Sequence, residues 1–512
     1  MSSTPSDVAA PPTKTRLAGV KAALKYTGIP PSWLDKRPKL PSRNWLIFIG
    51  VTSTLAGAYI YDYRQCRKIR QEYVDKVKYL AQEPLGSLDY PRKVTVYGTK
   101  WPGDEDSQRS MRYFRKYVKP ILVAAAVDYE MVNGRRYGDL ARRIAEEIKK
   151  KRRIEVGLDQ PPAPPMLLPQ ASPEEKRRRE LEGGIVIVGR PTFKEFMAGL
   201  KRGWTDSLDL VDREEQLSRD LESDGRFDEP EPEPEASADI DGEPIPTASR
   251  LPPSKPFAAF SPPIMHGLTP TPSSFSPSSS SSGSFIPAEL NTPPASIPPQ
   301  PPIVFVHFIN HIGFSQIPHM IWDFFNERHR VREGAQDAYR LIVGQTRPFV
   351  APPPEVLTQV SDADADLDPS TSPAQPHLTE FLPSDLNFDK DAETYYKKSL
   401  VRSFASDIAK AREEYYAALP KRLETARALA WGAREPTKDE RSYPPPTEVE
   451  LRAERMKKEL RWRADEEGWE IIRPDKEVDW DERFREALKV FVNSLSESEN
   501  AKAEGEGGEN KS

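Results

Sequence analysis

The sequence predicts an α/β protein with a single N-terminal transmembrane helix, an open and mostly parallel sheet that carries a long disordered insertion, and a C-terminal α-helical region. Three observations lead to this class. One uncharged segment near the N-terminus is apolar and long enough to cross a bilayer. Strand and helix patterns alternate behind it, and the last third of the chain carries helical periodicity.

The composition excludes several classes of protein. The chain has 512 residues, of which 53 are prolines and 30% are charged, and its formal net charge is -5. This acidic balance disfavours a nucleic-acid binder, because such proteins neutralise phosphates with lysine and arginine. Cys66 is the only cysteine, which excludes an intramolecular disulfide framework and a thiolate zinc site.

Residues 44–61 form the predicted transmembrane helix. These 18 uncharged residues would span about 27 Å at about 1.5 Å per residue, close to the thickness of the hydrocarbon core. Trp45 at one end and Tyr59 and Tyr61 at the other lie where aromatic rings prefer the headgroups. The alternative, a buried helix of a soluble domain, is disfavoured by the prolines upstream and the charged segment that follows at once.

The predicted span carries small residues at spacings of three and four. Such a face lets two transmembrane helices approach closely, so it is a candidate packing site for a neighbouring span. The candidate residues are Gly50, Ser53, Thr54, Gly57 and Ala58.

The N-terminal segment, residues 1–43, is basic and rich in serine, threonine and alanine. Before residue 35 it holds four basic residues against the single acid Asp7, which is the chemistry of a mitochondrial transit peptide. The immediate flanks of the span carry equal positive charge and do not set an orientation. A mitochondrial reading places the N-terminus in the matrix and the bulk of the chain in the intermembrane space. An unstructured basic cytosolic tail remains the alternative.

Strand and helix patterns alternate through residues 62–204, the first part of the predicted α/β domain. The expected strands are 94–97, 128–132 and 183–189. Three helices are expected. The first begins near residue 107 and bends at Pro120, the second has Asp139 as its N-cap, and the third begins at Pro191.

The predicted sheet is then interrupted and resumed. Residues 205–302 are read as a disordered insertion, because residues 205–245 hold 16 acids against 3 basic residues and a Pro/Ser-rich stretch follows. Residues 303–350 continue the domain with a strand at 303–310, a helix around 319–330 and a strand at 338–345. Residues 351–383 form a linker.

Residues 384–493 are predicted to be helical, followed by a disordered acidic tail at 494–512. An apolar stripe begins at Tyr396 and should end or kink at Pro420. Thr447 and Glu450 form a capping box that opens a helix ending at Gly468. A shorter helix is expected at 482–493.

The sequence offers no catalytic or metal-binding pattern. His307 and His311 lie four residues apart without the glutamate of a zinc protease and are not expected to bind metal. The segment GGIVIVGRPTF, residues 183–193, ends a strand and opens a helix, where a phosphate would bind, but it fits neither GxGxxG nor a P-loop. No cofactor is expected.

Residues 91–200 resemble the nucleotide-binding half of diacylglycerol-kinase-like lipid kinases. That family places a GGDGT loop after its third strand, followed by a helix with a glutamate and then a glycine, and Thr192, Glu195 and Gly199 match this pattern. Val188, Arg190 and Pro191 replace the first glycine, the aspartate and the last glycine of the loop. The resemblance therefore implies a kinase-like fold without kinase activity, in which Gly189–Thr192 is a degenerate phosphate loop and Arg190 is placed to meet an anion.

A second resemblance covers most of the chain. The segments PSRNWLIFIGV, YDYRQCRKIR, PRKVTVYG, the run from YFRKYVKPIL to LARRIAEEI, PIVFVHFINHIGFSQIPHMIWDFF and YYKKSL are similar to the fungal Tim54 family. The similarity spans roughly residues 40–200, 302–350 and 385–490, and it skips the insertion.

This resemblance implies a non-enzymatic subunit of the mitochondrial carrier translocase, anchored in the inner membrane by one span. The implied partners are the channel and other translocase subunits, the small chaperone complexes of the intermembrane space, carrier precursor proteins and an inner-membrane protease. Two other hypotheses stay open at this point. One is a membrane-anchored, kinase-like enzyme acting on lipid or nucleotide, and the other is a tether without a role in translocation.

Overall fold

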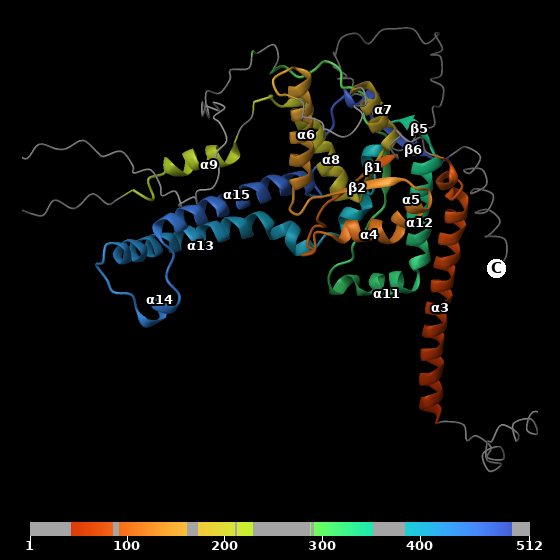
Figure 1. Cartoon of the computed structure of the whole chain (residues 1–512). Coiled ribbons are helices and arrows are strands. Elements are labelled where there is room, and N and C mark those ends of the chain that lie inside the picture. The colour runs from red at the N-terminus through yellow and green to blue at the C-terminus, as the bar shows by residue number, and fades with distance from the viewer. Residues whose placement is uncertain are drawn as a thin grey trace, which may run out of the picture.

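The structure is a computed structural model that describes residues 42–84, 92–160, 173–209, 212–228, 287, 291–351 and 384–493. It has three parts, which Figure 1 shows from one side. A sheet covered by helices forms the body, one long helix descends beside it, and a pair of long helices projects from the opposite side as an arm. The predictions for residues 1–41, 352–383 and 494–512 lie outside the described residues.

The body is built on a six-stranded sheet in the order β2-β1-β3-β4-β6-β5. Neighbouring strands are parallel except β5, which pairs antiparallel with β6 at the edge. The strands are β1 (Lys93–Gly98), β2 (Asp128–Asn133), β3 (Ile185–Val188), β4 (Ile303–Val306), β5 (Gln345–Pro348) and β6 (Lys489–Val492). The open, mostly parallel sheet predicted from the alternation of strands and helices is confirmed.

Helices cover both faces of the sheet, so that every residue of β3 is buried. One face packs against α4 (Arg109–Tyr117), α5 (Lys119–Ala124), α12 (Glu327–Val343) and the second half of α3 (Arg43–Val77). The other face packs against α6 (Asp139–Glu155) and α8 (Arg190–Thr205). Burial on both faces explains why β3 is a continuous apolar run.

Helix α3 is longer than the predicted span. It runs without interruption for 35 residues, through the charged segment after Tyr61. It is the one helix of the described chain that is long and apolar enough to cross a membrane, and none of its apolar window is buried in the protein. Beyond the window, Asp62, Cys66, Ile69 and Val77 are buried, because they repeat on the side of α3 that contacts α12 and α5.

The arm consists of α13 (Lys398–Ala430) and α15 (Glu448–Ile472), with the short helix α14 (Lys438–Ser442) between them. The predicted capping box at Thr447 and Glu450 is present. Helix α13 passes through Pro420, so of the two predicted effects of this proline, an end or a kink, the end is wrong. Helix α15 also passes through Gly468, which was expected to stop it. A Cβ on Gly468 would lie 2.1 Å from the carbonyl oxygen of Tyr137, so this glycine allows the helix to lie directly on the backbone of the body.

Two elements were assigned to the wrong type. Residues 338–343, predicted as a strand, are the end of α12, because Val331, Ala335, Ala338 and Leu341 place a helical stripe in the core. Residues 482–493, predicted as a helix, contain only the single turn α16 (Phe484–Ala487) before β6. Short apolar runs fit either period, and here the position in the sheet decides between them.

Smaller corrections concern helix starts and the insertion. The N-cap of α6 is Gly138, with a φ of 77°, and Asp139 is the first helical residue. Within the predicted insertion, α9 (Arg213–Glu222) is a helix capped by Asp212 that contacts α15, and Ile297 is buried against the body. These parts of 205–302 are not disordered, whereas 229–286 lie outside the described residues. Two further α-helices of the described residues are α7 (Pro173–Gly183) and α11 (Ile317–Phe325).

Candidate functional site

The sheet changes its winding direction between β1 and β3. The chain passes from β1 to β2 on one side and then crosses to β3 and β4 on the other. In open α/β sheets, ligands bind in the crevice outside the carboxyl ends of the two strands at such a switch point. Gly189–Thr192, the predicted degenerate phosphate loop, lies at the carboxyl end of β3, and Thr99 follows β1. The candidate site of the sequence analysis is therefore at the position where this fold would bind a ligand.

Thr192 closes the floor of this crevice. Its hydroxyl donates to the carbonyl of Val188 at 2.6 Å and accepts from the backbone N–H of Thr99 at 3.1 Å. The Ser110 hydroxyl donates to the Thr99 carbonyl at 3.1 Å. The polar groups at the two strand ends thus satisfy each other, and the side chains of Thr99 and Thr192 are almost completely buried.

Gly189 and Pro191 support this closed turn. Gly189 has a φ of 79°, in the left-handed region that favours glycine, and a Cβ there would lie 3.2 Å from the side chain of Phe308. Pro191 is buried in the first turn of α8, where a missing N–H costs nothing. The space above the loop is therefore occupied by an aromatic ring of the chain itself.

A segment from the beginning of the C-terminal region lies across the crevice. We call residues 384–396 the acidic strap, because its acids Asp385, Asp389 and Glu393, four residues apart, each pair with a basic residue of the body. The ion-pair distances are 2.6 Å for Asp385 with Arg347, 2.6 Å for Asp389 with His307, and 2.8 Å for Glu393 with Arg190 and with Lys194. The body and the C-terminal region are thus joined at three separate acidic side chains of the acidic strap.

Glu393 meets the anion-binding end of α8. Its carboxylate accepts from Arg190 Nε and lies at the same distance from Lys194 Nζ, one turn further along the helix. Arg190 also donates to the carbonyls of Leu386 and Phe388, at 2.5 and 3.0 Å. All three charged side chains are less than a tenth exposed, and burial lowers the pKa of Lys194. Arg190, the residue that the sequence analysis placed to meet an anion, is thus paired with a carboxylate of the same chain.

Glu195 and Gly199, the other residues that match the kinase pattern, have packing roles. Glu195 is completely buried and accepts a hydrogen bond from the backbone N–H of Leu140, at the start of α6, at 3.0 Å. Burial raises the pKa of its carboxyl group to about 8. A Cβ on Gly199 would lie 2.8 Å from the carbonyl oxygen of Ala141. Both residues therefore serve the contact between α8 and α6.

The two histidines have separate partners. His307 pairs with Asp389, which raises the pKa of its imidazole. His311 Nε2 lies 3.1 Å from Asp323, and its Nδ1 lies 3.1 Å from Gln316. Over the described ranges, no group of three or more His, Cys, Asp or Glu side chains is arranged to hold a metal ion.

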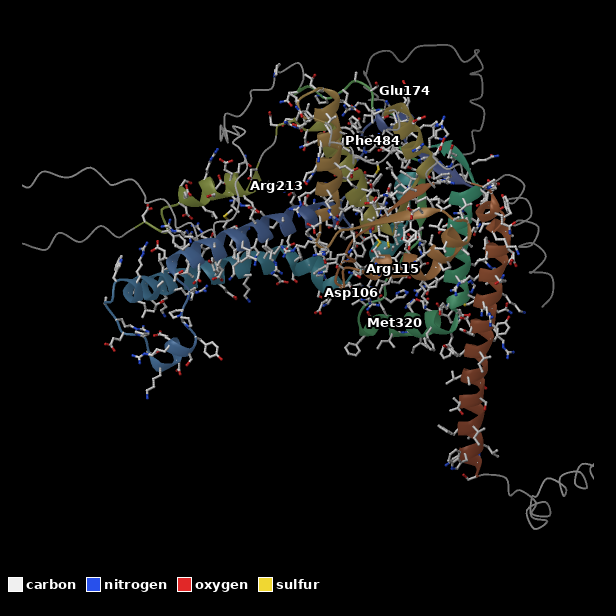
Figure 2. The ribbon with its side chains drawn as sticks, viewed as in Figure 1. Asp106, Arg115, Glu174, Arg213, Met320 and Phe484 are labelled. Carbon is white, nitrogen blue, oxygen red and sulfur yellow. The ribbon has the colours of Figure 1, made fainter. Side chains whose placement is uncertain are left out.

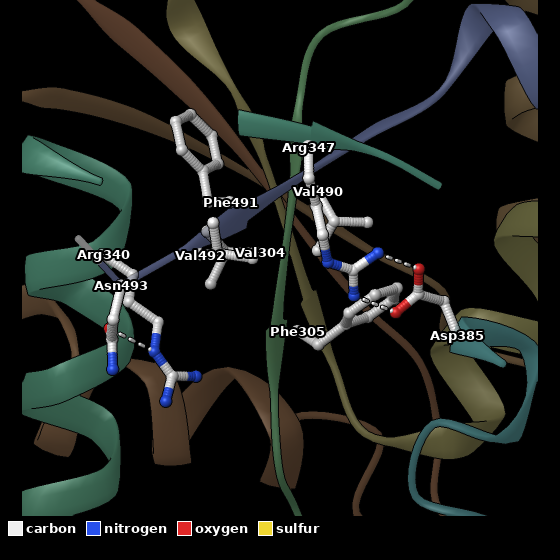
Figure 3. A pocket seen from close by; sticks show the side chains of 9 residues that line it. All are labelled: Val304, Phe305, Arg340, Arg347, Asp385, Val490, Phe491, Val492 and Asn493. Carbon is white, nitrogen blue, oxygen red and sulfur yellow. Dashed lines mark hydrogen bonds and ion pairs between the residues drawn. The ribbon is translucent and has the colours of Figure 1, made fainter. Parts of the chain in front are cut away.

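A hollow of about 280 Å³ opens where β4 and β6 diverge after a single bridge between Ile303 and Val490. Figure 3 shows the two arginines at its sides, each already engaged. Arg347 makes a two-pronged contact with Asp385, at 2.6 and 2.7 Å, and Arg340 donates to Asn493 at 2.7 Å. The lining is otherwise apolar, so the hollow brings together no nucleophile and base.

The small-residue face of α3 is the second predicted site. Gly50, Ser53, Thr54, Gly57 and Ala58 are all exposed. The Thr54 hydroxyl donates to the carbonyl of Gly50 at 2.8 Å, and a Cβ built on Gly50 or Gly57 meets nothing within 4 Å. No described part of the chain covers this face.

Sequence reasoning missed the acidic strap and Asp62. Asp62 is 3% exposed and accepts from the backbone N–H of Glu327 at 3.0 Å and of Arg328 at 3.3 Å, at the start of α12. The four-residue spacing of Asp385, Asp389 and Glu393 is visible in the sequence, but in a region predicted to be helical it indicates only one face of a helix. Their partners lie 38 to 203 residues away in the chain, so that no local sequence pattern identifies them.

These features define a class: a membrane-anchored α/β protein in which the carboxyl edge of the sheet at the switch point is covered by a segment of the same chain. Comparison with known proteins narrows the class to a family. Residues 21–413 match the family described as "Inner membrane protein import complex subunit Tim54". The chain is 38% identical over 485 residues to the mitochondrial import inner membrane translocase subunit TIM54 of Cryptococcus neoformans var. neoformans, covering 94% of this chain and 96% of that protein. It is 32% identical over 326 residues to the corresponding subunit of Aspergillus oryzae, covering 61% and 67% of the two chains.

The chain belongs to the Tim54 family. It is accordingly a mitochondrial inner-membrane protein of the import machinery, and its partners include other subunits of that complex. The resemblance of residues 91–200 to lipid kinases is not supported by these comparisons, since the match to the Tim54 family runs through the whole of that segment.

Proposed function

We propose that the chain is a non-enzymatic scaffold of the carrier translocase. It supports the insertion of multispanning carrier proteins by holding the channel subunit and by docking the small chaperone complexes that deliver them. The observation that carries the non-enzymatic part is the position of Glu393. The anion-binding end of α8 at the switch point is neutralised by a buried carboxylate of the same chain, and a phosphate would have to displace it.

The proposed topology places the N-terminus in the matrix and the body in the intermembrane space. The basic, acid-poor leader supports it, since a matrix-targeting segment followed by an apolar stop-transfer segment gives this arrangement. Protease treatment of mitoplasts tests it. A body that resists protease after the outer membrane is opened contradicts the proposed side.

The small-residue face of α3 is proposed to pack against a neighbouring span of the translocase. Tyr59, Asp62, Cys66 and Ile69 repeat at three and four residues on the side that contacts the body. At 3.6 residues per turn, Gly50 lies about half a turn around the helix from Tyr59. Gly50, Ser53 and Gly57 thus face away from the body, where another helix has room to approach. Ala58 lies four residues before Asp62 and is on the side of the body.

Affinity purification of the tagged, full-length protein from mitochondria in mild detergent tests the scaffold. Recovery of carrier-translocase subunits and small chaperones supports it, and their absence contradicts it. The variant Gly50→Leu with Gly57→Leu should still insert into the membrane but should release neighbouring spans at lower detergent concentration. The matched control, Ile47→Leu with Leu55→Ile, keeps large residues at large positions and should behave as the unchanged protein does.

An ATP-binding measurement on the same purified protein tests the alternative enzyme. The closed crevice predicts no saturable binding. Tight ATP binding that Arg190→Glu abolishes would overturn the scaffold, because it requires a nucleotide at the degenerate loop.

A further inference from the structure

Helix α11 is an apolar helix on the outside of the protein. Its sequence is IPHMIWDFF, and none of its nine residues is buried. The single turn before it, Phe314–Gln316, adds another exposed ring, since Phe314 is 91% exposed and Trp322 on α11 is 67% exposed. The other large exposed apolar residues of α11 are Ile317, Met320, Ile321 and Phe324. Water is a poor environment for this surface.

The two polar side chains of α11 contact neighbouring parts of the chain, and of these two only His319 is exposed. Asp323, its one acidic residue, pairs with Arg330 and lies 3.1 Å from His311. The His319 ring packs against the rings of His311 and Tyr395, with centroids 5.3 and 5.9 Å apart. The exposed side of the helix therefore carries apolar side chains, and moving it out of water would bury no unpaired charge of α11.

Two contacts fix α11 at the end of the apolar part of α3. Phe324 stacks on Tyr59, with centroids 5.6 Å apart and planes 16° from parallel. Asp62 binds the backbone N–H groups of Glu327 and Arg328, immediately after α11. Figure 1 shows α11 running across the direction of α3 at the edge of the body nearest the span, and Figure 2 labels Met320 on it.

This position sets the depth of α11 relative to a bilayer. Tyr59 lies two residues before the end of the uncharged segment 44–61, a rise of about 3 Å along the helix. If α3 crosses the membrane, Tyr59 lies where the acyl chains meet the headgroups, the level that tyrosine and tryptophan prefer. Helix α11 lies at the same level, and a helix with one apolar, aromatic face is suited to lie in the plane of that interface.

We propose that α11, with Phe314, is an interfacial membrane helix that seats the body on the same leaflet from which α3 emerges. The occupant of its apolar face is lipid at the boundary of headgroups and acyl chains. The argument rests on α3 as the span and is independent of the scaffold role. Failure of either proposal therefore leaves the other standing.

Depth-dependent quenching in nanodiscs tests the proposal on the full-length protein. In a Cys66→Ser background, Trp322→Cys is labelled with the environment-sensitive dye NBD. Leu55→Cys, inside the span, and Glu174→Cys, exposed at the start of α7 on the edge of the body that lies away from the span in Figure 2, are the matched controls. Each sample is quenched with nitroxide lipids that carry the radical near the headgroup or deep in the chain, and with iodide in water. Each labelled protein must unfold at the temperature of its unlabelled parent.

The expected result is a larger loss of emission at position 322 with the shallow nitroxide than with the deep one, and little loss with iodide. Position 55 should respond most to the deep nitroxide and position 174 to iodide alone. A response at 322 like that at 174 overturns the proposal, because the helix is then in water. Protection at 322 from both nitroxides and iodide also overturns it, since a second copy of the protein rather than lipid would then cover the helix.

Discussion

Arg190 donates from Nε to the carboxylate of Glu393 over 2.8 Å, although 203 residues separate them in the chain. Lys194 shares the same carboxylate, and all three side chains are almost completely buried. This contact joins the start of α8, at the centre of the sheet, to a segment that directly precedes the arm. The crevice is therefore closed as a consequence of how the C-terminal region is attached to the body.

Glu393→Gln should destabilise the protein by about 3–5 kcal/mol, because it leaves two buried cations without a counter-charge. The free energy of unfolding in detergent, measured with denaturant, checks this. Glu215→Gln, which removes the partner of Arg219 in an exposed pair on α9, is the control and should change the free energy by less than about 1 kcal/mol. Equal effects of the two variants would mean that Glu393 does not hold the crevice closed.

Asp62→Ala should loosen the start of α12 from α3. The carboxylate satisfies two N–H groups of the first turn, and the loss of such a cap costs about 0.5–2 kcal/mol. Hydrogen exchange should become faster at Glu327 and Arg328 while the sheet stays protected. Asp75→Ala, an exposed acid on the same helix, should leave exchange at α12 unchanged. Unaltered exchange in Asp62→Ala contradicts the prediction.

Glu195 should make stability fall as pH rises. Its folded-state pKa of about 8 lies above the usual 4.5, so the folded protein holds a proton between these pH values that the unfolded chain releases. Glu195→Gln removes this dependence. Its unfolding free energy should be close to that of the unchanged protein near pH 5 and higher by a few kcal/mol at pH 9, since one pKa unit corresponds to about 1.4 kcal/mol.

The difference between the two proteins is the quantity to measure, by denaturant unfolding at both pH values. Burial also raises the pKa of Asp337, to about 7. The pH dependence of stability that Asp337 adds is the same in both proteins and cancels in the difference. A difference that is the same at pH 5 and pH 9 would show that Glu195 is not the titrating group.

Gly468→Ala should lower stability although alanine is the better helix former. The added methyl group would meet the backbone of Tyr137 and Gly138, at 2.1 and 2.7 Å, so α15 must move away from the body. Overpacking of this kind typically costs about 1–3 kcal/mol. Thermal unfolding of the detergent-solubilised protein checks it, and Ser406→Ala on the exposed side of α13 is the control. A Gly468→Ala protein as stable as the control would place α15 elsewhere.

The sequence analysis was right wherever one periodicity repeated over many residues. The span, the alternation from β1 to α8 and the capping box at Thr447 depend on local patterns, and all three are present. It was wrong where an element is short or its context is distant. The run KVFV suits a helix or a strand equally, and only its place between β4 and β5 makes it β6. Gly468 looked like a helix end because its real role, close contact with Tyr137, involves a residue 331 positions earlier.

The sequence predicted that Gly189–Thr192 follows a strand and opens a helix, but it did not predict the contact with Glu393. A strand followed by Gly189 and a helix start identifies the carboxyl edge of a parallel sheet from local sequence. Which group fills that edge depends on tertiary contacts. Arg190 and Lys194 are a single helical turn apart, whereas Glu393 arrives from beyond the insertion and the linker. Charge pairing over such separations leaves no periodic trace in one sequence.

The continuity of α3 has a consequence for how bound proteins are presented at the membrane. If residues 62–77 were a flexible linker, the body could move by about 20 Å relative to the span. A protein bound to the body would then have no fixed position at the membrane, only an effective concentration set by the linker. Instead, one unbroken helix of 35 residues carries the span into the body. The span and the arm therefore rotate together, so that the direction of the arm in the membrane plane follows the rotation of the span about its own axis. A neighbouring helix that packs against one face of the span thereby also fixes the orientation of the arm in the membrane plane.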